Sequence, residues 1–235
     1  MEAVEVNVQP KRTFYSIVVK RALDIVLSLA AIIVLSWLLL VVCILELIFH
    51  GWPVFYTTKR PGKDEKIFKL IKFRSMTNAR DENGYLLPEE QRLTKFGLFI
   101  RKTSIDELPE LFNILKGDMS IIGPRPLLVE YLDLYSPRHK MRHSVRPGFA
   151  CVRIKNDTGS ATWTWREQFE NDIYYIENVS LTTDVKMVLA VIREVFKASD
   201  GRAQDTRVPF DGKNLDEVRS KNEVENVVRY ESVAK

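Results

Sequence analysis

The centre of this chain reads SIDELPELFNILKG over residues 104–117 and DMSIIGPRP over residues 118–126. Apolar residues in the first part recur at i, i+3, i+4 and i+7, the spacing of one helical face, at Leu108, Leu111, Phe112 and Leu115. Gly117 stands where such a helix typically ends, since glycine adopts the left-handed conformation without steric cost. The segment therefore predicts a short helix that begins beside two adjacent acids, Asp106 and Glu107.

Two starting points for this helix fit the sequence. Ser104 and Glu107 have the spacing of a capping box, whereas Pro109 favours a helix that begins later. Either start places both carboxylates near the positive end of the helix dipole, where a phosphate or a divalent cation can also bind. The acids therefore fit two interpretations, as simple helix-capping residues or as part of a phosphate-handling site.

Basic residues on both sides of the acids favour the second interpretation. Arg101 and Lys102 precede the acids, and Gly123-Pro124-Arg125-Pro126 follows the helix. Pro124 and Pro126 restrict the backbone around Arg125, which directs its guanidinium toward a phosphate.

The run from Thr103 to Leu127 resembles the signature of the monotopic polyprenyl-phosphate phosphoglycosyl transferases, bacterial sugar transferases with an Asp-Glu dyad. The resemblance extends over about residues 14 to 213 and is closest to the small single-domain members. Further matching motifs are Lys20-Arg21 with Asp24, Arg60-Pro61-Gly62, Lys72-Phe73-Arg74-Ser75-Met76, Arg142-His143, Arg146-Pro147-Gly148, and Tyr174-Tyr175 with Asp184.

This resemblance implies an enzyme, a phosphoglycosyl transferase that moves a phosphosugar from a UDP-sugar to polyprenyl phosphate. Asp106 would be the nucleophile that forms a covalent phosphosugar intermediate and releases UMP, and Glu107 would help to hold Mg²⁺ with it. Arg101 and Arg125 would bind the diphosphate or the nucleotide. The implied location is the bacterial inner membrane, with the catalytic domain facing the cytoplasm.

Further site residues come from a basic hairpin and from the helix that precedes it. Residues 53–73 alternate β-prone and basic residues around a turn at Arg60-Pro61-Gly62-Lys63, which predicts a hairpin that brings Arg60 and Lys72 to phosphate groups or simply a solvated charged face. Arg146 is a further substrate-binding candidate from its matching motif. The expected membrane-anchoring residues are Lys20, Arg21, Asp24 and Ser36.

Charge and cysteine content narrow the class of protein. The 235 residues carry a net charge of +4, which suits an anionic surface or a phosphorylated substrate, and no nucleic-acid-binding motif occurs. The two cysteines, Cys43 and Cys151, lack the spacing of a disulfide or zinc framework, which favours a reducing compartment.

An uncharged segment, Ile25 to Leu45, predicts a membrane helix of roughly 31 Å. Basic residues flank it on both sides, which favours a helix that enters the bilayer and turns back over a single span. The family pattern has Ser-Pro at the turn, but this chain has Ser36-Trp37, so the expected bend depends on a hydrogen bond from Ser36 to a carbonyl one turn back. We expect Asp24 to pair with Lys20 and Arg21 at the interface.

The expected fold is α+β and mostly helical. It comprises an N-terminal arm (1–13), a membrane helix (14–50), a cytoplasmic catalytic domain (51–198) with amphipathic interfacial helices, and a polar tail (199–235). Residues 166–178 and 184–197 predict two helices, and Leu93, Phe96 and Ile100 mark another. Residues 126–143 fit either a lipid interface or core packing.

Some questions stay open at this level. Residues 149–156 depart from the family pattern, and neither the sugar nor the oligomeric state can be read from the sequence. Two alternatives remain to the covalent enzyme: a transferase that acts by direct transfer, and a membrane-anchored scaffold without activity.

Overall fold

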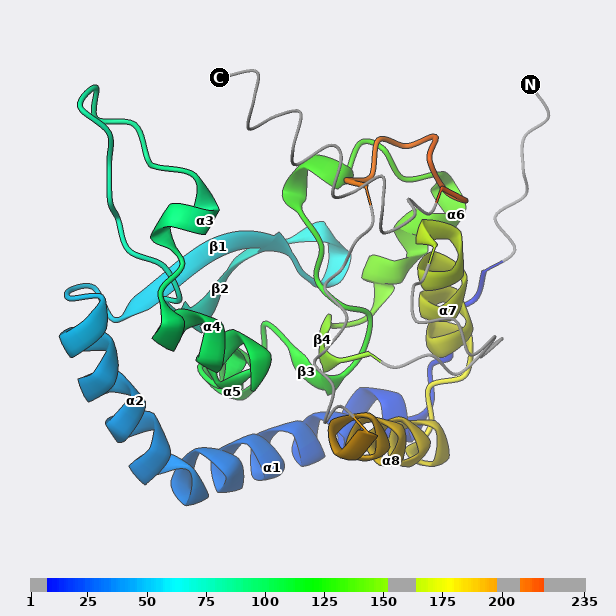
Figure 1. Cartoon of the computed structure of the whole chain (residues 1–235). Coiled ribbons are helices and arrows are strands. Elements are labelled where there is room, and N and C mark those ends of the chain that lie inside the picture. The colour runs from blue at the N-terminus through cyan, green and yellow to red at the C-terminus, as the bar shows by residue number, and fades with distance from the viewer. Residues whose placement is uncertain (1–7, 152–163, 198–207, 218–235) are drawn as a thin grey trace.

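The computed structural model describes residues 8–151, 164–197 and 208–217. Its fold is α+β, with helices surrounding an antiparallel hairpin (Figure 1). The longer elements are α1 (Lys20–Val34), α2 (Ser36–Phe49), β1 (Phe55–Pro61), β2 (Ile67–Phe73), α4 (Lys95–Lys102), α5 (Glu110–Lys116), α7 (Trp165–Glu177) and α8 (Leu181–Lys197). The shorter ones are α3 (Glu89–Arg92), β3 (Ser120–Ile122), α6 (Pro137–Lys140) and β4 (Gly148–Ala150).

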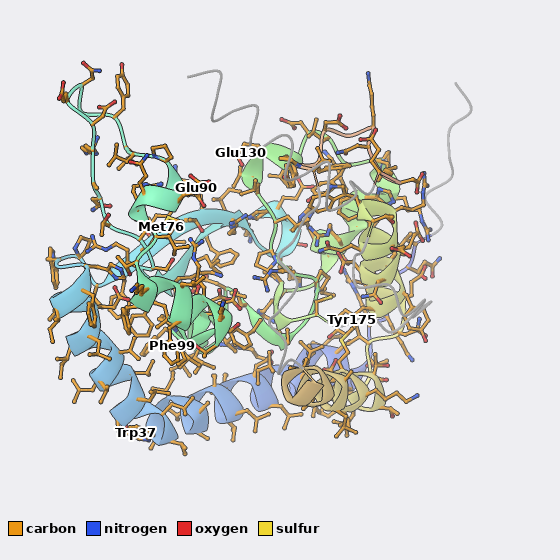
Figure 2. The ribbon with its side chains drawn as sticks, in the orientation of Figure 1. Trp37, Met76, Glu90, Phe99, Glu130 and Tyr175 are labelled. Carbon is orange, nitrogen blue, oxygen red and sulfur yellow. The ribbon has the colours of Figure 1, made fainter. Side chains whose placement is uncertain are left out.

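The first two helices form a bent pair along one side of the molecule (Figure 1). In the described part of the chain no single helix is long and apolar enough to cross a membrane, but residues Tyr15–Val34 and Ser36–Phe49 meet the length and composition together and are bent by 62°. Ser36 Oγ donates to Ile33 O at 2.7 Å, which confirms the expected hydrogen bond to the preceding turn. Trp37 lies at the corner and is 66% exposed (Figure 2).

The predicted hairpin is confirmed. β1 and β2 are antiparallel, with Phe55 opposite Phe73 and Pro61 opposite Ile67. Phe68, Leu70 and Phe73 of β2 are buried, as expected from the alternation of apolar and basic residues in the sequence.

α5 is packed against this hairpin through an apolar face and one polar residue. Leu111 and Ile114 share a core cluster with Phe68 and Leu70. Asn113 Nδ2 donates to Lys69 O at 2.8 Å and its Oδ1 accepts from Ile71 N at 3.1 Å, so the amide joins the helix to the edge of β2. Gly117 ends the helix with φ 103°, as the sequence predicts.

The remaining helices build two further cores. α7 and α8 confirm the two predicted helices, and β3 pairs with β4 in parallel. Residues 126–143 take the core alternative, because Tyr131 and Tyr135 are buried. The aromatic cluster around them also contains Trp165, Phe169 and Phe210.

Both ends of the described chain contact this body. Val8 is 5% exposed, and Lys11 N donates to Ile176 O at 2.9 Å, so residues 8–13 lie against α7. Phe210, from the segment predicted as a polar tail, is 4% exposed. The departure from the family pattern at 152–156, most of the predicted tail, and the side chains of Ile192 and Phe196 fall outside the described residues.

Candidate active site

The two adjacent acids lie in a 3₁₀ turn (Ile105–Glu107) between α4 and α5. Ser104 has φ 56° and makes no side-chain cap, so the capping-box interpretation is wrong. Pro109 directly precedes α5, which agrees with the later helix start. The capping box does not form because the Glu107 carboxylate instead accepts hydrogen bonds from Lys72 and Arg125.

Glu107 is held between a strand and a loop. Its Oε1 accepts from Lys72 Nζ of β2 and from Arg125 Nη2, each at 2.7 Å. Burial alone would raise the pKa of Glu107, but Arg125 and Lys72 together lower it to about 2. Glu107 is therefore an ionised, fixed carboxylate across the physiological range.

Glu110 is a third acid in this cluster. It is 4% exposed and lies 3.2 Å from the same Lys72 ammonium. Burial raises its pKa to about 7 in spite of Lys72. Because Arg125 bonds to Glu107 and not to Glu110, the negative charge is best stabilised on Glu107, and Glu110 exchanges its proton near neutral pH.

The environment of the Asp106 carboxylate differs from those of Glu107 and Glu110. Among the residues that the structure describes, no other side chain donates a hydrogen bond to its carboxylate within 3.5 Å. Burial and then the nearby charge of Glu107 raise the pKa of Asp106, while Lys72 and Arg101 oppose the shift. Asp106 is thus a half-buried acid whose oxygens remain available to a ligand.

Asp106 and Glu107 line a cavity of about 580 Å³. Its walls come from the hairpin, α4 and residues 74–92, including Met76 (Figure 2). The cationic lining residues are Arg60, Lys72, Arg74, Arg92 and Arg101. The lining acids are Glu89, Asp106 and Glu107, so cations are in excess and the cavity suits an anionic ligand such as a diphosphate.

The arginines of the cavity are mostly not neutralised by protein acids. Within the described ranges, no salt bridge within 4.0 Å joins Arg60, Arg92 or Arg101 to a carboxylate. Arg101 Nε donates to Ser75 Oγ at 2.7 Å, and Arg74 donates to the carbonyls of His50 and Gly51. These contacts fix side chains in place and leave their positive charge for a ligand.

The structure brings together most of the predicted site residues. Asp106, Glu107, Arg60, Lys72 and Arg101 line the cavity, and Arg125 joins them through Glu107. Pro124 and Pro126 border a small cleft beside Arg125.

Arg146 lies apart from this group, since its Nε donates to Gly117 O at 2.9 Å at the far end of α5. It also lines a separate cavity that does not include the acids.

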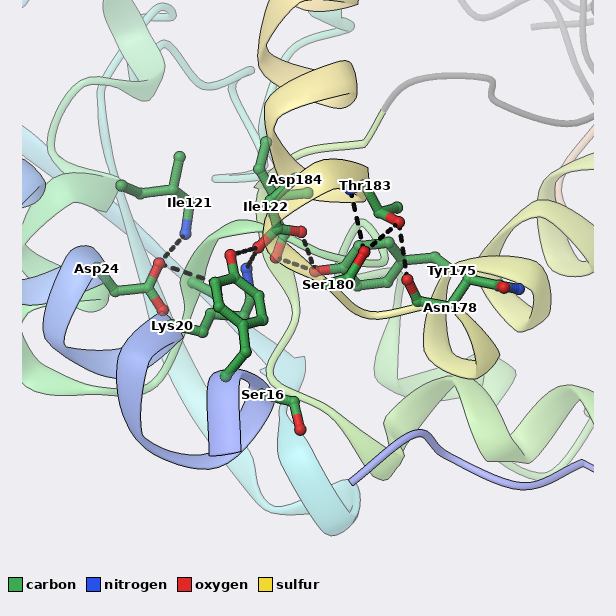
Figure 3. Close-up of polar contacts among 12 residues, drawn as sticks. Ser16, Lys20, Asp24, Ile121, Ile122, Tyr175, Asn178, Ser180, Thr183 and Asp184 are labelled. Atoms are coloured by element: carbon green, nitrogen blue, oxygen red, sulfur yellow. Dashed lines mark hydrogen bonds and ion pairs between the residues drawn. The ribbon is translucent and has the colours of Figure 1, made fainter. Parts of the chain in front are cut away.

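The predicted anchoring residues bind the body of the protein. Lys20 Nζ pairs with Asp184 Oδ2 at 2.6 Å (Figure 3), and the Arg21 guanidinium donates to Ile114 O at 2.7 Å and Leu115 O at 2.9 Å. The predicted pairing of Asp24 with Lys20 and Arg21 is wrong, since neither cation forms a salt bridge with it within 4.0 Å.

Asp24 instead accepts hydrogen bonds from Ser120 Oγ and Ile121 N, each at 3.0 Å. It is 3% exposed, so it is a buried link between α1 and β3 and not an interfacial ion pair.

Several contributors were missed by sequence reasoning. Glu110 lies three residues after Glu107, yet only the packing shows that it shares Lys72 with Glu107. Arg74 and Arg92 needed the fold to place them at the cavity.

Arg142 supports the site from behind. It donates to Arg125 O at 2.8 Å and pairs with Asp172 at 2.7 Å, which holds the Arg125 loop. In the sequence, this role is signalled by the motif Arg142-His143, which matches the family pattern.

The dyad also fits the chemistry of a magnesium ligand set. Both contacts to Glu107 use Oε1, and the Asp106 carboxylate is not bound to a cation in the described part of the chain. No group of three metal-binding side chains occurs among the described residues. Mg²⁺ commonly takes one or two carboxylates and completes its shell with water and substrate phosphates, so two acids beside a cationic cavity suffice.

Comparison with known proteins identifies the family. The chain is 42% identical over 191 residues to the sugar transferase EpsL of Bacillus subtilis (strain 168), covering 81% of this chain and 93% of that protein. It is 37% identical over 190 residues to the UDP-N-acetylgalactosamine-undecaprenyl-phosphate N-acetylgalactosaminephosphotransferase of Aeromonas hydrophila, with 78% of this chain and 45% of that protein covered.

A third relative, the UDP-glucose:undecaprenyl-phosphate glucose-1-phosphate transferase of Klebsiella pneumoniae, is 34% identical over 189 residues, which cover 77% of this chain and 41% of that protein. The chain thus spans less than half the length of the latter two relatives. The family model described as bacterial sugar transferase matches residues 15–198 and includes the whole cavity. This chain belongs to the bacterial sugar transferase family.

Proposed function

We infer that this protein transfers a sugar phosphate from a UDP-sugar to polyprenyl phosphate, giving polyprenyl-diphospho-sugar and UMP. The observation that carries the inference concerns the described residues: the Asp106 carboxylate has no side-chain partner among them, and the arginines of its cavity have no salt bridge to any of their acids. The names of the Aeromonas and Klebsiella relatives support this donor and acceptor chemistry.

In the first step an Asp106 carboxylate oxygen attacks the phosphorus that carries the sugar. The new bond makes an acyl phosphate, the bond to the UMP oxygen breaks, and UMP leaves with that electron pair. Arg101 and the other cavity arginines neutralise the diphosphate as it approaches. Glu107, fixed by Lys72 and Arg125, keeps the attacking residue and the cations in place.

In the second step an oxygen of polyprenyl phosphate attacks the same phosphorus. The bond to Asp106 breaks, which restores the carboxylate and yields the diphosphate product. Asp106 and Glu107 would hold Mg²⁺, which when bound supplies positive charge to the phosphates.

The acceptor is a lipid, so the site needs a membrane on one side. The bent α1–α2 pair exposes apolar residues such as Val26 (62%), Ile33 (64%) and Leu40 (62%). We propose that the pair enters the bacterial inner membrane from the cytoplasmic face and returns to it, while α8 lies in the interface. Cysteines introduced before Lys20 and after Lys59 are then expected to label from the same side; labelling from opposite sides would establish a span.

The covalent step is tested by intact mass. Purified full-length protein with Mg²⁺ and a panel of UDP-sugars, without lipid acceptor, is expected to gain one phosphosugar and release one UMP. The Asp106→Asn variant is expected to gain none. Turnover with acceptor by a protein that never gains mass would favour direct transfer, and no UMP release from any UDP-sugar would favour the scaffold.

A further inference from the structure

A second cavity lies beyond the C-terminal end of α5, opposite the acids. It has a volume of about 430 Å³ and shares no lining residue with the cavity of Asp106. We call it the basal cavity, because the start of α1 forms one of its walls, near the contacts drawn in Figure 3. α5 separates the two cavities by roughly 10 Å of helix.

The basal cavity is strongly cationic. Its charged lining contains a single acid, Asp24, which already accepts hydrogen bonds from Ser120 and Ile121. The basic residues that line it are Lys11, Arg12, Lys20, Arg21, Lys63 and Arg146. Of these, only Lys20 has a salt bridge in the part of the chain that the structure describes, to Asp184 at 2.6 Å. The remaining positive charge is left for an anion.

Two of these cations are held in position by the protein. Arg21 donates to the Ile114 and Leu115 carbonyls, and Arg146 donates to Gly117 O at 2.9 Å. A hydroxyl adds to the lining, because Ser144 Oγ is buried and has no hydrogen-bond partner within the described residues. Fixed guanidinium groups and an unpartnered hydroxyl are the donors that bind a phosphate group.

Apolar side chains border the same cavity. Ile17 lines it and is 62% exposed, next to Phe14 at 74% and Val18 at 48%. α8, whose first turns lie beside α1 (Figure 1), exposes Leu181 at 52% and Leu189 at 50%. The cations therefore meet an exposed apolar surface at one boundary, which is the arrangement found at the headgroup level of a bilayer.

From this juxtaposition we propose that the basal cavity binds the phosphate group of an anionic membrane phospholipid, as a site separate from the one where the sugar phosphate is transferred. The phosphodiester is bound by the fixed Arg21 and Arg146 and by the Ser144 hydroxyl, with the exposed cations Lys11, Arg12 and Lys63 adding positive charge around it, while the acyl chains pass along Ile17 toward the bilayer. The proposal rests on the membrane association proposed above. A soluble phosphate carries the same chemistry, so the test separates the two sources.

The test measures lipid binding to the detergent-solubilised full chain by native mass spectrometry. The probes are dioctanoyl phosphatidylglycerol, dioctanoyl phosphatidylcholine and inorganic phosphate. The variant is Arg12→Gln/Lys63→Gln. The matched control is Lys59→Gln/Lys66→Gln, which removes the same charge from exposed hairpin residues that do not line the cavity. All four side chains belong to exposed residues, so each variant is expected to fold.

The wild type is expected to bind phosphatidylglycerol saturably and more tightly than phosphatidylcholine. The cavity variant should lose about fivefold in affinity for each cation removed, and the control should lose little. An equal loss in both variants would reduce the effect to surface charge and overturn the proposal. Equal affinity for both lipids would also overturn it, as would displacement of phosphatidylglycerol by stoichiometric inorganic phosphate.

The same samples keep this proposal distinguishable from the proposed function. UMP release without added anionic lipid is expected to be unchanged in the Arg12→Gln/Lys63→Gln variant, because neither residue lines the cavity of Asp106. Selective phosphatidylglycerol binding by a protein that releases no UMP would remove the proposed reaction and leave the lipid site standing.

Discussion

At the C-terminal end of α5, Arg21 and Arg146 donate to main-chain carbonyls. At the N-terminal end, Lys72 and Arg125 hold Glu107, while Asp106 receives no hydrogen bond from another side chain within the described chain. The C-terminal contacts satisfy backbone groups that a helix otherwise leaves open. Charged residues lie at both ends of α5, so residue type does not distinguish the ends. Their partners do, since the charges at the C-terminal end are bound to the backbone, whereas Asp106 at the N-terminal end is available to a ligand.

The largest expected effect is on activity, at Asp106. Asp106→Asn should lower the rate of UMP release by about 10³-fold or more, because the amide cannot attack phosphorus as a carboxylate does. The free energy of unfolding should not fall, since no other described side chain loses a hydrogen bond and the neutral amide avoids the burial and repulsion that raise the pKa of Asp106. Asp118→Asn, at the other end of α5, is the control. A normal rate in Asp106→Asn would remove Asp106 from the mechanism.

The next largest effect is on stability and is expected at Arg21, which contacts the C-terminal end of α5. Arg21→Gln should lower the free energy of unfolding by about 2–3 kcal/mol, because two charge-assisted hydrogen bonds to the end of α5 are lost. Thermal unfolding in detergent measures it, with exposed Arg12→Gln as the control. Unchanged stability combined with lost activity would contradict the division between the two ends.

Glu110 gives a pH-dependent effect. Its pKa is raised to about 7 in the folded protein from an ordinary value of 4.5, so the folded state keeps a proton that the unfolded chain releases. The stabilisation is complete below pH 4.5 and is lost as the pH rises through 7. In wild type the free energy of unfolding should fall by about 3 kcal/mol over this interval, and Glu110→Gln should abolish that fall. Unfolding measured from pH 4.5 to 8 tests it, and parallel curves for variant and wild type would refute the assignment.

The smallest effect is expected at the exposed pair beside Arg21. Lys116 Nζ lies 2.9 Å from Asp118, but its side chain is 72% exposed. Lys116→Gln should therefore change the free energy of unfolding by less than about 0.5 kcal/mol. A loss as large as that of Arg21→Gln would mean that exposure does not separate the two cations.

Local signals in the sequence account for much of the fold. The hairpin, the stop at Gly117 and the helices α4, α7 and α8 follow from periodicity and turn chemistry. The capping box failed because Ser104 and Glu107 have the right spacing, but two distant cations take the Glu107 carboxylate. Spacing along the chain carries no information about such partners.

The site was only partly predictable for the same reason. The dyad and Arg101 were visible as neighbours in sequence, whereas the sharing of Lys72 between Glu107 and Glu110 arises from packing of β2 against α5. Asp24 was assigned to Lys20 because they lie one helical turn apart, but a buried hydroxyl and amide on β3 supply its contacts. Long-range hydrogen bonds decided each of these cases.

The hydrogen bonds from Arg21 to α5 couple the positions of two helices. Arg21 belongs to α1, and α5 begins only three residues after Glu107. A shift or rotation of α1 along its own axis would break two hydrogen bonds or carry α5 with it. Under the proposed membrane association and reaction, the depth of α1 in the bilayer would therefore set the distance of the Asp106 carboxylate from the membrane surface.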